Sequence, residues 1–186
     1  MSQLALRVAA YVQEEQLVIR YAVHNNGVHD AYLLNRLHRA SPPEMSPDIA
    51  YVELDANNGV VEVAKRIADT PITSGSGPPV PVAPYVTPVR VDETFSETIQ
   101  LALPVRIYRE YGRSPMPDPD HERVVEYQGV RLTLGYYWRD PGVTETPGVA
   151  LGEAVIIPGG FPRFPELLQI VSPVVPVRVP VVEPGQ

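Results

Sequence analysis

The chain contains no cysteine, and among its 186 residues it has only one lysine and three phenylalanines. Without cysteine there is no disulfide framework, no thiolate metal site and no cysteine nucleophile. No basic run is longer than Lys65-Arg66 and the net charge is −7, so the concentrated basic surface that nucleic-acid binding requires is missing. The same negative net charge disfavours binding to anionic lipids. We therefore expect neither a nucleic acid nor a membrane as partner.

Long apolar runs are missing as well. No stretch approaches the ~20 residues of a membrane-spanning helix. The first residues show no basic segment ahead of an apolar one, because Arg7 interrupts the apolar run. We expect no signal peptide and a cytoplasmic protein.

Proline is the residue in excess, with 22 prolines beside 13 glycines. Each proline inside a helix costs about 3 kcal/mol, so a mainly helical protein is disfavoured. The hydrophobic content of 44% supplies a sizeable core and excludes a wholly disordered chain. The length predicts a single domain.

Apolar residues alternate with polar ones along several segments, which indicates half-buried β-strands. Asn57-Asn58-Gly59 lies between two such segments and predicts a hairpin turn. A helix is the alternative for residues 31–38 and for residues 60–67. The expected strands are residues 4–12, 16–25, 31–38, 49–55, 60–67, 94–105, 124–138 and 153–157.

Short strands separated by turns predict an all-β fold, an antiparallel two-sheet β-sandwich of the immunoglobulin-like kind with long proline-rich loops. One domain would span residues 1–172, with a proline-rich crossover at 71–88 and an exposed loop at 113–120. Residues 173–186 form a Val/Pro-rich tail, interpreted as an edge strand, a polyproline-like wrap or a disordered extension. The expected core residues are Leu17, Ile19, Tyr21, Val23, Ile99, Leu101, Leu103, Leu132 and Leu134.

Two segments resemble bacterial immunoglobulin-like domains. Residues 17–27, LVIRYAVHNNG, are similar to the second strand and following turn of such domains, and residues 88–97, PVRVDETFSE, to their segment of a proline, an acidic turn and a strand. The resemblance implies a sandwich fold and no shared catalysis. Antibody-type domains carry a Cys…Trp…Cys core, so a chain without cysteine resembles only a generic sandwich.

Aromatic side chains give the only candidate ligand site, at Tyr136, Tyr137 and Trp138. Aromatic rings exposed on a sheet can stack on sugars or anchor a protein partner. The competing interpretation is that alternate rings belong to the core and the others cover the sheet.

Metal and catalytic motifs are weak. His24, His29, Asp30 and His38 lie near one another in sequence but match no compact metal signature, and we interpret the histidines as exposed. The acidic run at residues 118–122 lacks the glycine and closing glutamate of a calcium loop. There is no G-x-S-x-G elbow, phosphate loop or dinucleotide motif. We expect no catalytic residue, metal or cofactor.

Three functional hypotheses remain. The first is a non-enzymatic structural or protein-interaction module that acts through sheet edges, loops and the C-terminal tail on a protein partner or a second copy of itself. The second is a carbohydrate- or small-ligand-binding sandwich that uses the aromatic residues. The third is a hydrolase whose site the sequence does not reveal.

Overall fold

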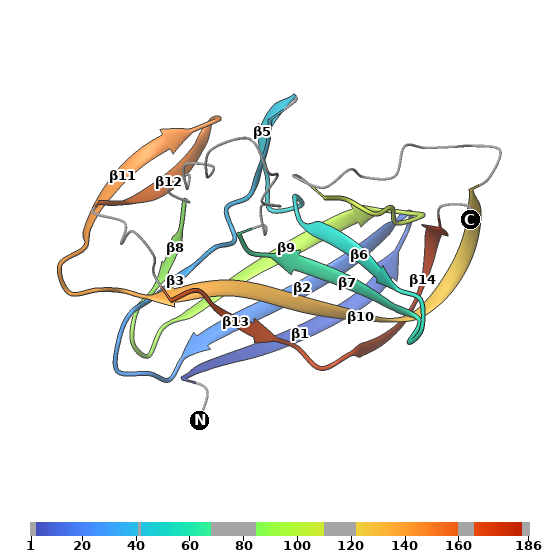
Figure 1. Cartoon of the computed structure of the whole chain (residues 1–186), viewed down its shortest axis with the longest axis horizontal. Helices are drawn as coiled ribbons and strands as arrows, with labels where there is room; N and C mark the ends of the chain where they lie inside the picture. The colour runs from blue at the N-terminus through green and yellow to red at the C-terminus, as the bar shows by residue number, and fades with distance from the viewer. Residues whose placement is uncertain (1–2, 41, 68–84, 110–121, 160–165, 184–186) are drawn as a thin grey trace, which may run out of the picture.

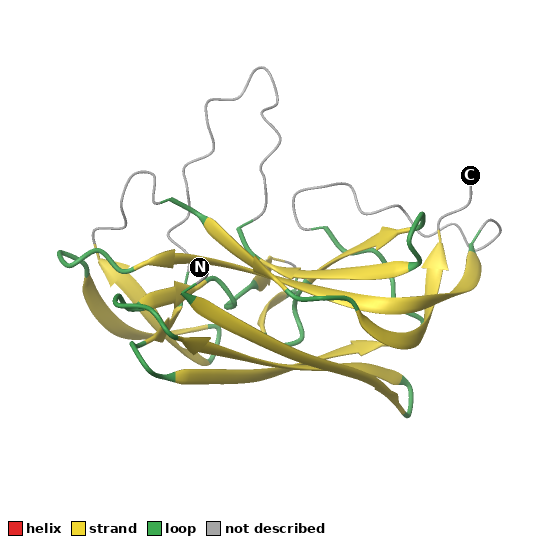
Figure 2. Cartoon of the chain, turned by 90° about the horizontal axis from the view of Figure 1, so that it is seen from below, coloured by secondary structure: helices red, strands yellow, loops and turns green. Residues whose placement is uncertain are grey.

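The protein is an all-β protein with several sheets, described here from a computed structural model of the chain. The structure describes residues 3–40, 42–67, 85–109, 122–159 and 166–183. Within these ranges every regular element is a strand, and no helix is long and apolar enough to cross a membrane. The two larger sheets lie face to face as two layers (Figure 2).

The smaller of these two sheets has the strand order β1-β2-β9, and all its neighbours are antiparallel. Glu14 and Glu15 form the turn between the first two strands, with Glu14 at a φ of 54°. This confirms the strands predicted for residues 4–12 and 16–25. The strands are β1 (Leu4–Gln13), β2 (Gln16–Asn25) and β9 (Thr94–Ala102).

The larger sheet is built around one long strand, β10, which crosses the whole molecule (Figure 1). Its order is β6-β7-β10-β3-β8, and β13 and β14 also pair with β10. The predicted hairpin around residues 57–59 is confirmed as β6-β7. The strands are β3 (Ala31–Leu33), β6 (Tyr51–Asp55), β7 (Val60–Lys65), β8 (Thr87–Val89), β10 (Arg123–Trp138), β13 (Leu168–Val171) and β14 (Val175–Glu183).

One pairing differs from the antiparallel prediction, because β7 runs parallel to β10. A parallel pair needs a long crossover connection, and here residues 66–122 provide it. Most of the predicted proline-rich crossover and the whole loop at 113–120 lie outside the described residues. The strand predicted for residues 31–38 is observed only at its two ends, as β3 and as the first residue of the later strand that begins at His38.

Two short sheets complete the fold. One is the hairpin of β11 (Thr144–Ala150) and β12 (Glu153–Gly159), which forms its own two-stranded sheet at one end of the molecule (Figure 1). The other pairs β4 (His38–Ala40) with β5 (Pro43–Met45). The sheets are not closed.

The core lies between the two larger sheets and contains inward-facing residues of both. Seven of the nine predicted core residues are buried, whereas Leu101 and Leu103 are half-buried at its margin. The C-terminal segment belongs to the same core: it is strand β14, and its Val179 and Val181 are fully buried. The C-terminal segment is therefore a strand of the larger sheet over residues 175–183.

Candidate functional site

The predicted aromatic site lies at the C-terminal end of β10, and most of it is inside the protein. Tyr137 is 1% exposed and Tyr136 is also buried. Successive residues of a strand face opposite sides, and both sides are covered here, because Tyr136 belongs to the main core and Tyr137 to a second cluster with Tyr32 and Val143. Both rings are therefore buried in the structure, on opposite sides of the strand. Trp138 is half-buried and meets Tyr136 edge-on, with ring centres 5.3 Å apart.

The tyrosine hydroxyls of this region have raised pKa values. Burial is the main cause for Tyr136 and Tyr137, and the neighbouring Tyr32 adds to it for Tyr137. Neutral, buried rings support the packing of the strand rather than ligand stacking. Ligand binding by Tyr136, Tyr137 and Trp138 stays a prediction, with only Trp138 partly open to solvent.

The histidines and acidic residues do not come together. His24 bonds to Thr94, with Nδ1 2.9 Å from Oγ1, and Asp30 is held by Arg90 and Arg139 instead of by a histidine. Across the described ranges, no three His, Asp or Glu residues are arranged to hold a metal ion. Residues 118–121 of the acidic run lie outside the described part. The hydrolase hypothesis gains no residues from the structure and stays a prediction.

The β11-β12 hairpin exposes apolar side chains that sequence patterning did not single out. Val149 is 77% exposed and Leu151 is 49% exposed, and Ile157 lies on the neighbouring strand. The turn is Leu151-Gly152, with φ values of 51° and 84°. Positive φ at both central residues is typical of a two-residue hairpin turn in which asparagine or aspartate normally precedes glycine. Leucine there is both strained and exposed.

Polar contacts attach the base of this hairpin to the rest of the protein. Glu145 of β11 accepts hydrogen bonds from Arg90 at 2.5 and 2.7 Å and from the Tyr32 hydroxyl at 2.8 Å. Arg90 also bonds to Asp30 at 3.0 Å. The Arg90 hydrogen bonds lower the pKa of Glu145, whereas burial and Glu145 raise the pKa of Tyr32 to about 12. The base is fixed and the tip extends away from it.

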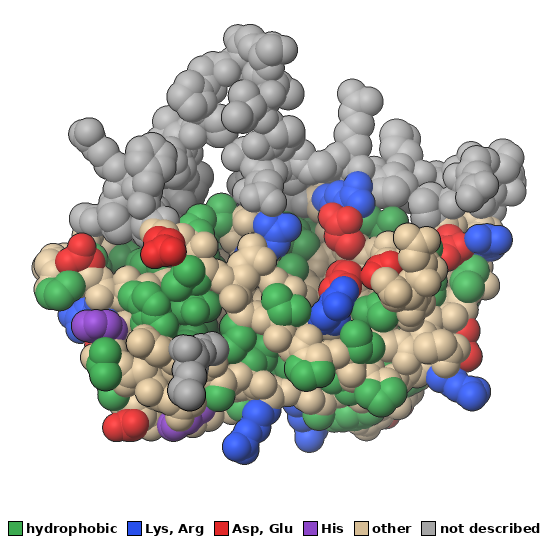
Figure 3. Space-filling view, turned by 60° about the horizontal axis from the view of Figure 1, so that its bottom comes forward, with side chains coloured by type: hydrophobic (Ala, Val, Ile, Leu, Met, Phe, Trp, Pro, Cys, Tyr) green, Lys and Arg blue, Asp and Glu red, His purple; other side chains and the backbone are tan. Residues whose placement is uncertain are grey.

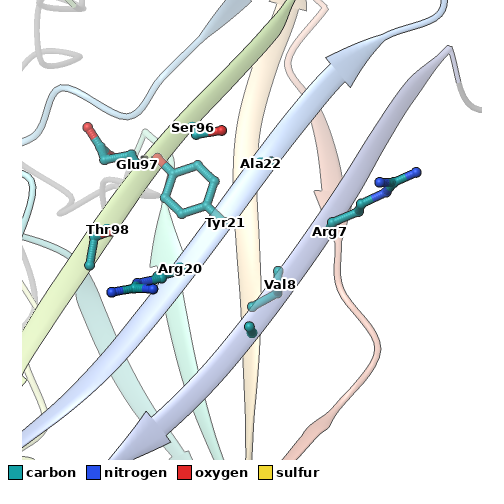
Figure 4. Close-up of a pocket in the computed structure, with 9 residues that line it drawn as sticks. Arg7, Val8, Arg20, Tyr21, Ala22, Ser96, Glu97 and Thr98 are labelled. Carbon is teal, nitrogen blue, oxygen red and sulfur yellow. Dashed lines mark hydrogen bonds between the residues drawn. The ribbon is translucent and has the colours of Figure 1, made fainter. Parts of the chain in front are cut away.

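A shallow hollow of about 560 Å³ lies against the smaller sheet, lined by residues 7–9, 20–22 and 96–98 (Figure 4). Val8, Tyr21 and Glu97 are register partners on three neighbouring strands. Val8 and Tyr21 pack in the core, so the residues beside these three face outward. The outward set combines two arginines with small side chains: Arg7, Ala9, Arg20, Ala22, Ser96 and Thr98. On the face that Figure 3 shows, acidic and basic side chains are interspersed.

A second polar group lies in the interior, between the two larger sheets. Lys65, at the end of β7, is 0% exposed, and its Nζ lies 2.7 Å from Oε2 of Glu97 on β9. The same carboxylate accepts a hydrogen bond from the Tyr21 hydroxyl at 2.5 Å and one from Nδ2 of Asn35 at 3.2 Å. Burial and Glu97 raise the pKa of Tyr21, and burial lowers the pKa of Lys65.

The sequence carried a signal for this interior group. Val61, Val63 and Lys65 alternate along one strand, which places the chain's only lysine on the same side as two core valines. Glu97 follows the same rule, because it alternates with Ile99, which belongs to the core, and with Phe95, which packs against it. A charged residue that falls on the apolar side of an alternating strand is therefore expected to be buried and to have a charged partner inside the protein.

The comparisons with known proteins end without a relative. No protein family matches the chain, and neither the curated proteins nor the solved structures include a match. The function is therefore inferred from the geometry of the chain itself.

Proposed function

We propose that this protein is a non-enzymatic structural or protein-interaction module, built on an immunoglobulin-like sandwich, whose contact element is the β11-β12 hairpin. The C-terminal tail was predicted from the sequence to contact a partner. In this proposal it is part of the fold instead, because β14 pairs with β10 of the same chain. The hairpin extends beyond the two larger sheets at one end of the molecule (Figure 1).

The observation that supports the proposal is Leu151 at the hairpin tip. A side chain with a Cβ at positive φ costs roughly 1–2 kcal/mol. Leu151 has this conformation and is 49% exposed, so the free domain gains little burial to offset the strain. Strained residues persist at sites of function, and exposed apolar side chains that cluster indicate contact surfaces. Val149 beside it adds to the same apolar tip.

A second copy of the chain is the partner to test first. The same apolar hairpin on two copies is self-complementary about a two-fold axis, which is the commonest symmetry of soluble oligomers. Arg90, Glu145 and Tyr32 hold the base in place, so the tip is presented with little loss of conformational freedom on binding.

The experiment is sedimentation velocity over a range of concentrations for the wild type and for Leu151→Asn. Asparagine suits the left-handed conformation and removes the apolar contact. We expect the wild type to shift from monomer to dimer as concentration rises and Leu151→Asn to remain a monomer. Val124→Thr, at an exposed apolar position on β10 away from the hairpin, is the matched control and keeps the wild-type behaviour.

A wild type that stays monomeric, or a Leu151→Asn variant that dimerises as the wild type does, would contradict contact through the hairpin. Dimerisation lost equally in Val124→Thr would place the contact elsewhere on the surface. In either case the hairpin would no longer be the contact element.

Small-ligand binding is the second candidate, and the hollow on the smaller sheet is the observation that favours it. Arg7 and Arg20 line a surface of small side chains, an arrangement that suits an anionic group on a saccharide or small molecule. Calorimetric titration of sulfated and neutral glycans would test it. We expect binding of the sulfated compounds only and its loss in Arg20→Gln, whereas no heat from either class would exclude the hollow as their site.

A further inference from the structure

The interior group of Lys65, Glu97 and Asn35 brings an amine, a carboxylate and a carboxamide together. One carboxylate contacts both other groups, through Oε2 to Lys65 Nζ at 2.7 Å and through Oε1 to Asn35 Nδ2 at 3.2 Å. Nζ also donates to the backbone carbonyl of Asn35 at 3.3 Å. Lys65 and Asn35 are 0% and 2% exposed, so water has little access to the three groups.

The topology of the larger sheet makes this meeting possible. Lys65 pairs with Leu134 of β10, and the Leu34 amide donates a hydrogen bond to the neighbouring Gly135 carbonyl at 2.9 Å. β7 and β3 follow one another along the same side of β10, because β13 pairs with residues 133–136 on the opposite side. Asn35 therefore lies beside Lys65 along one side of β10. Glu97 reaches them from the smaller sheet.

Gly135 leaves room beside β10 for the two segments that carry Lys65 and Asn35. A Cβ at this position would lie 2.8 Å from Cβ of Arg66, the residue after Lys65, and 3.2 Å from a methyl group of Leu34. Both distances are too short for ordinary contact, so a larger residue would push the two segments apart.

The surroundings favour a reactive amine. Burial lowers the pKa of Lys65, which increases the fraction of neutral, nucleophilic amine, although Glu97 acts in the opposite direction. Asn35 Oδ1 is buried and accepts no hydrogen bond from the described residues. A buried carboxamide oxygen without a donor is uncommon and calls for an explanation.

We propose that Lys65 and Asn35 form an intramolecular amide bond, with Glu97 as the acid–base group that carries the protons. The site is thus a modification site, and the chain catalyses its own cross-link. The proposal does not depend on contact through the hairpin.

The reaction is a transamidation and needs no other reactant. A proton passes from Nζ to Glu97, and the Nζ electron pair then forms a bond to Cγ of Asn35 while the carbonyl electrons move onto Oδ1. Glu97 gives its proton to Nδ2, which it already contacts, and takes a second proton from Nζ. The Cγ–Nδ2 bond breaks, Oδ1 becomes a carbonyl again and ammonia leaves. The departing ammonia takes up the proton that Glu97 holds and goes as ammonium, so the carboxylate is regenerated and nothing is oxidised or reduced.

The cross-link would tie the end of β7 to the segment after β3, on one side of the central strand. The two residues are 30 positions apart in sequence, and closing a loop of this size restricts the unfolded chain much as a disulfide does. A chain without cysteine would gain a covalent closure that does not depend on redox conditions.

The test is the mass of the purified wild type, measured in denaturant after the folded protein has been incubated for several days. We expect the sequence mass minus one ammonia. Succinimide formation at Asn26-Gly27 or Asn58-Gly59 gives the same loss, so a second measurement is needed. Digestion of the denatured protein with a lysine-specific protease separates the two, because Lys65 is the only lysine.

An unmodified chain is cut into residues 1–65 and 66–186, whereas a cross-linked chain resists cleavage. We expect the wild type to resist, and a fragment spectrum to join the peptides that contain Asn35 and Lys65. Glu97→Gln should keep the full sequence mass and be cut. Glu53→Gln, at an exposed carboxylate on β6, is the matched control and should behave as the wild type.

Two further outcomes would overturn the proposal. A wild type of full sequence mass that is cut at Lys65 would show that the group is an ion pair only. A loss of ammonia with complete cleavage at Lys65 would assign the loss to a succinimide. Because both are read on the wild type, they do not depend on whether Glu97→Gln folds.

Discussion

The interior of the two larger sheets and the β11-β12 hairpin follow opposite rules within one chain. In the interior, even charged groups find partners, as Lys65 does with Glu97 at 2.7 Å. On the hairpin, Val149 and Leu151 remain exposed, and Leu151 has a positive φ. The interior is therefore arranged for stability, whereas the hairpin keeps features that lower it. This difference is the reason to assign contact to the hairpin.

The largest expected effect concerns the C-terminal strand. Deletion of residues 173–186 removes the buried side chains of Val179, Val181 and Val182. Each is worth roughly 1.5–3 kcal/mol, and together they approach the ~5–15 kcal/mol that stabilises a typical domain. We expect loss of cooperative thermal unfolding by circular dichroism. A truncated chain that unfolds as the wild type does would show that β14 is not part of the core.

Two glycines sharpen the comparison between the regions. Gly135→Ala places a Cβ 2.8 Å from Cβ and 3.0 Å from Cα of Arg66, so we expect a loss of about 1–3 kcal/mol from overpacking. Gly152→Ala, on the hairpin, meets no atom within 4 Å, and only its φ of 84° is unfavourable. We expect a loss of about 1 kcal/mol there. Urea unfolding of both variants measures which one loses more unfolding free energy. A greater loss in Gly152→Ala than in Gly135→Ala would contradict this prediction.

The junction of the two regions should respond to pH. Arg90 lowers the pKa of Glu145 in the folded protein, so the ionised carboxylate stabilises the fold above its unfolded pKa of about 4.3 and this contribution is lost as the pH falls through the lowered value. Glu145→Gln should be less stable than the wild type by about 1 kcal/mol at neutral pH. Urea unfolding at about pH 7 and pH 3 tests this. A difference that grows in acid would refute the role of Arg90.

The smallest expected change has the opposite sign. Leu151→Asn should raise the free energy of unfolding by about 0.5–1 kcal/mol, because asparagine tolerates the left-handed conformation better than leucine. The midpoint of urea unfolding measures it at a concentration where the wild type is monomeric. A decrease would mean that the Leu151 side chain stabilises the free domain, and the argument for contact at the tip would lose its basis.

Much of the fold was predictable from local pattern. Alternation along residues 16–25 and 124–138 identified β2 and the long β10, and Asn57-Asn58-Gly59 identified the β6-β7 hairpin. These signals are local, because side chains alternate along a strand and a two-stranded hairpin is fixed by its turn. The parallel pairing of β7 with β10 joins segments far apart in the chain, and no local pattern predicts it.

The candidate site was less predictable, since alternation shows which residues share a side but not what covers that side. Tyr136 and Tyr137 alternate, so one of them was expected to face solvent. In the structure the second side is covered too, by the cluster that includes Tyr32 and Val143. The exposure of the hairpin tip depends in the same way on where β11 and β12 lie.

The sequence by itself determined the all-β class, the positions of the longer strands of the two main sheets and the inward direction of Lys65 and Glu97, because these follow from composition and from a period of two residues along each strand. Only the tertiary structure decided that these two side chains meet, that Asn35 joins them and that both tyrosines are buried. Contacts between residues that are distant in sequence depend on which strands pair and which sheets pack face to face. Both are set by the fold of the whole chain and not by any local segment.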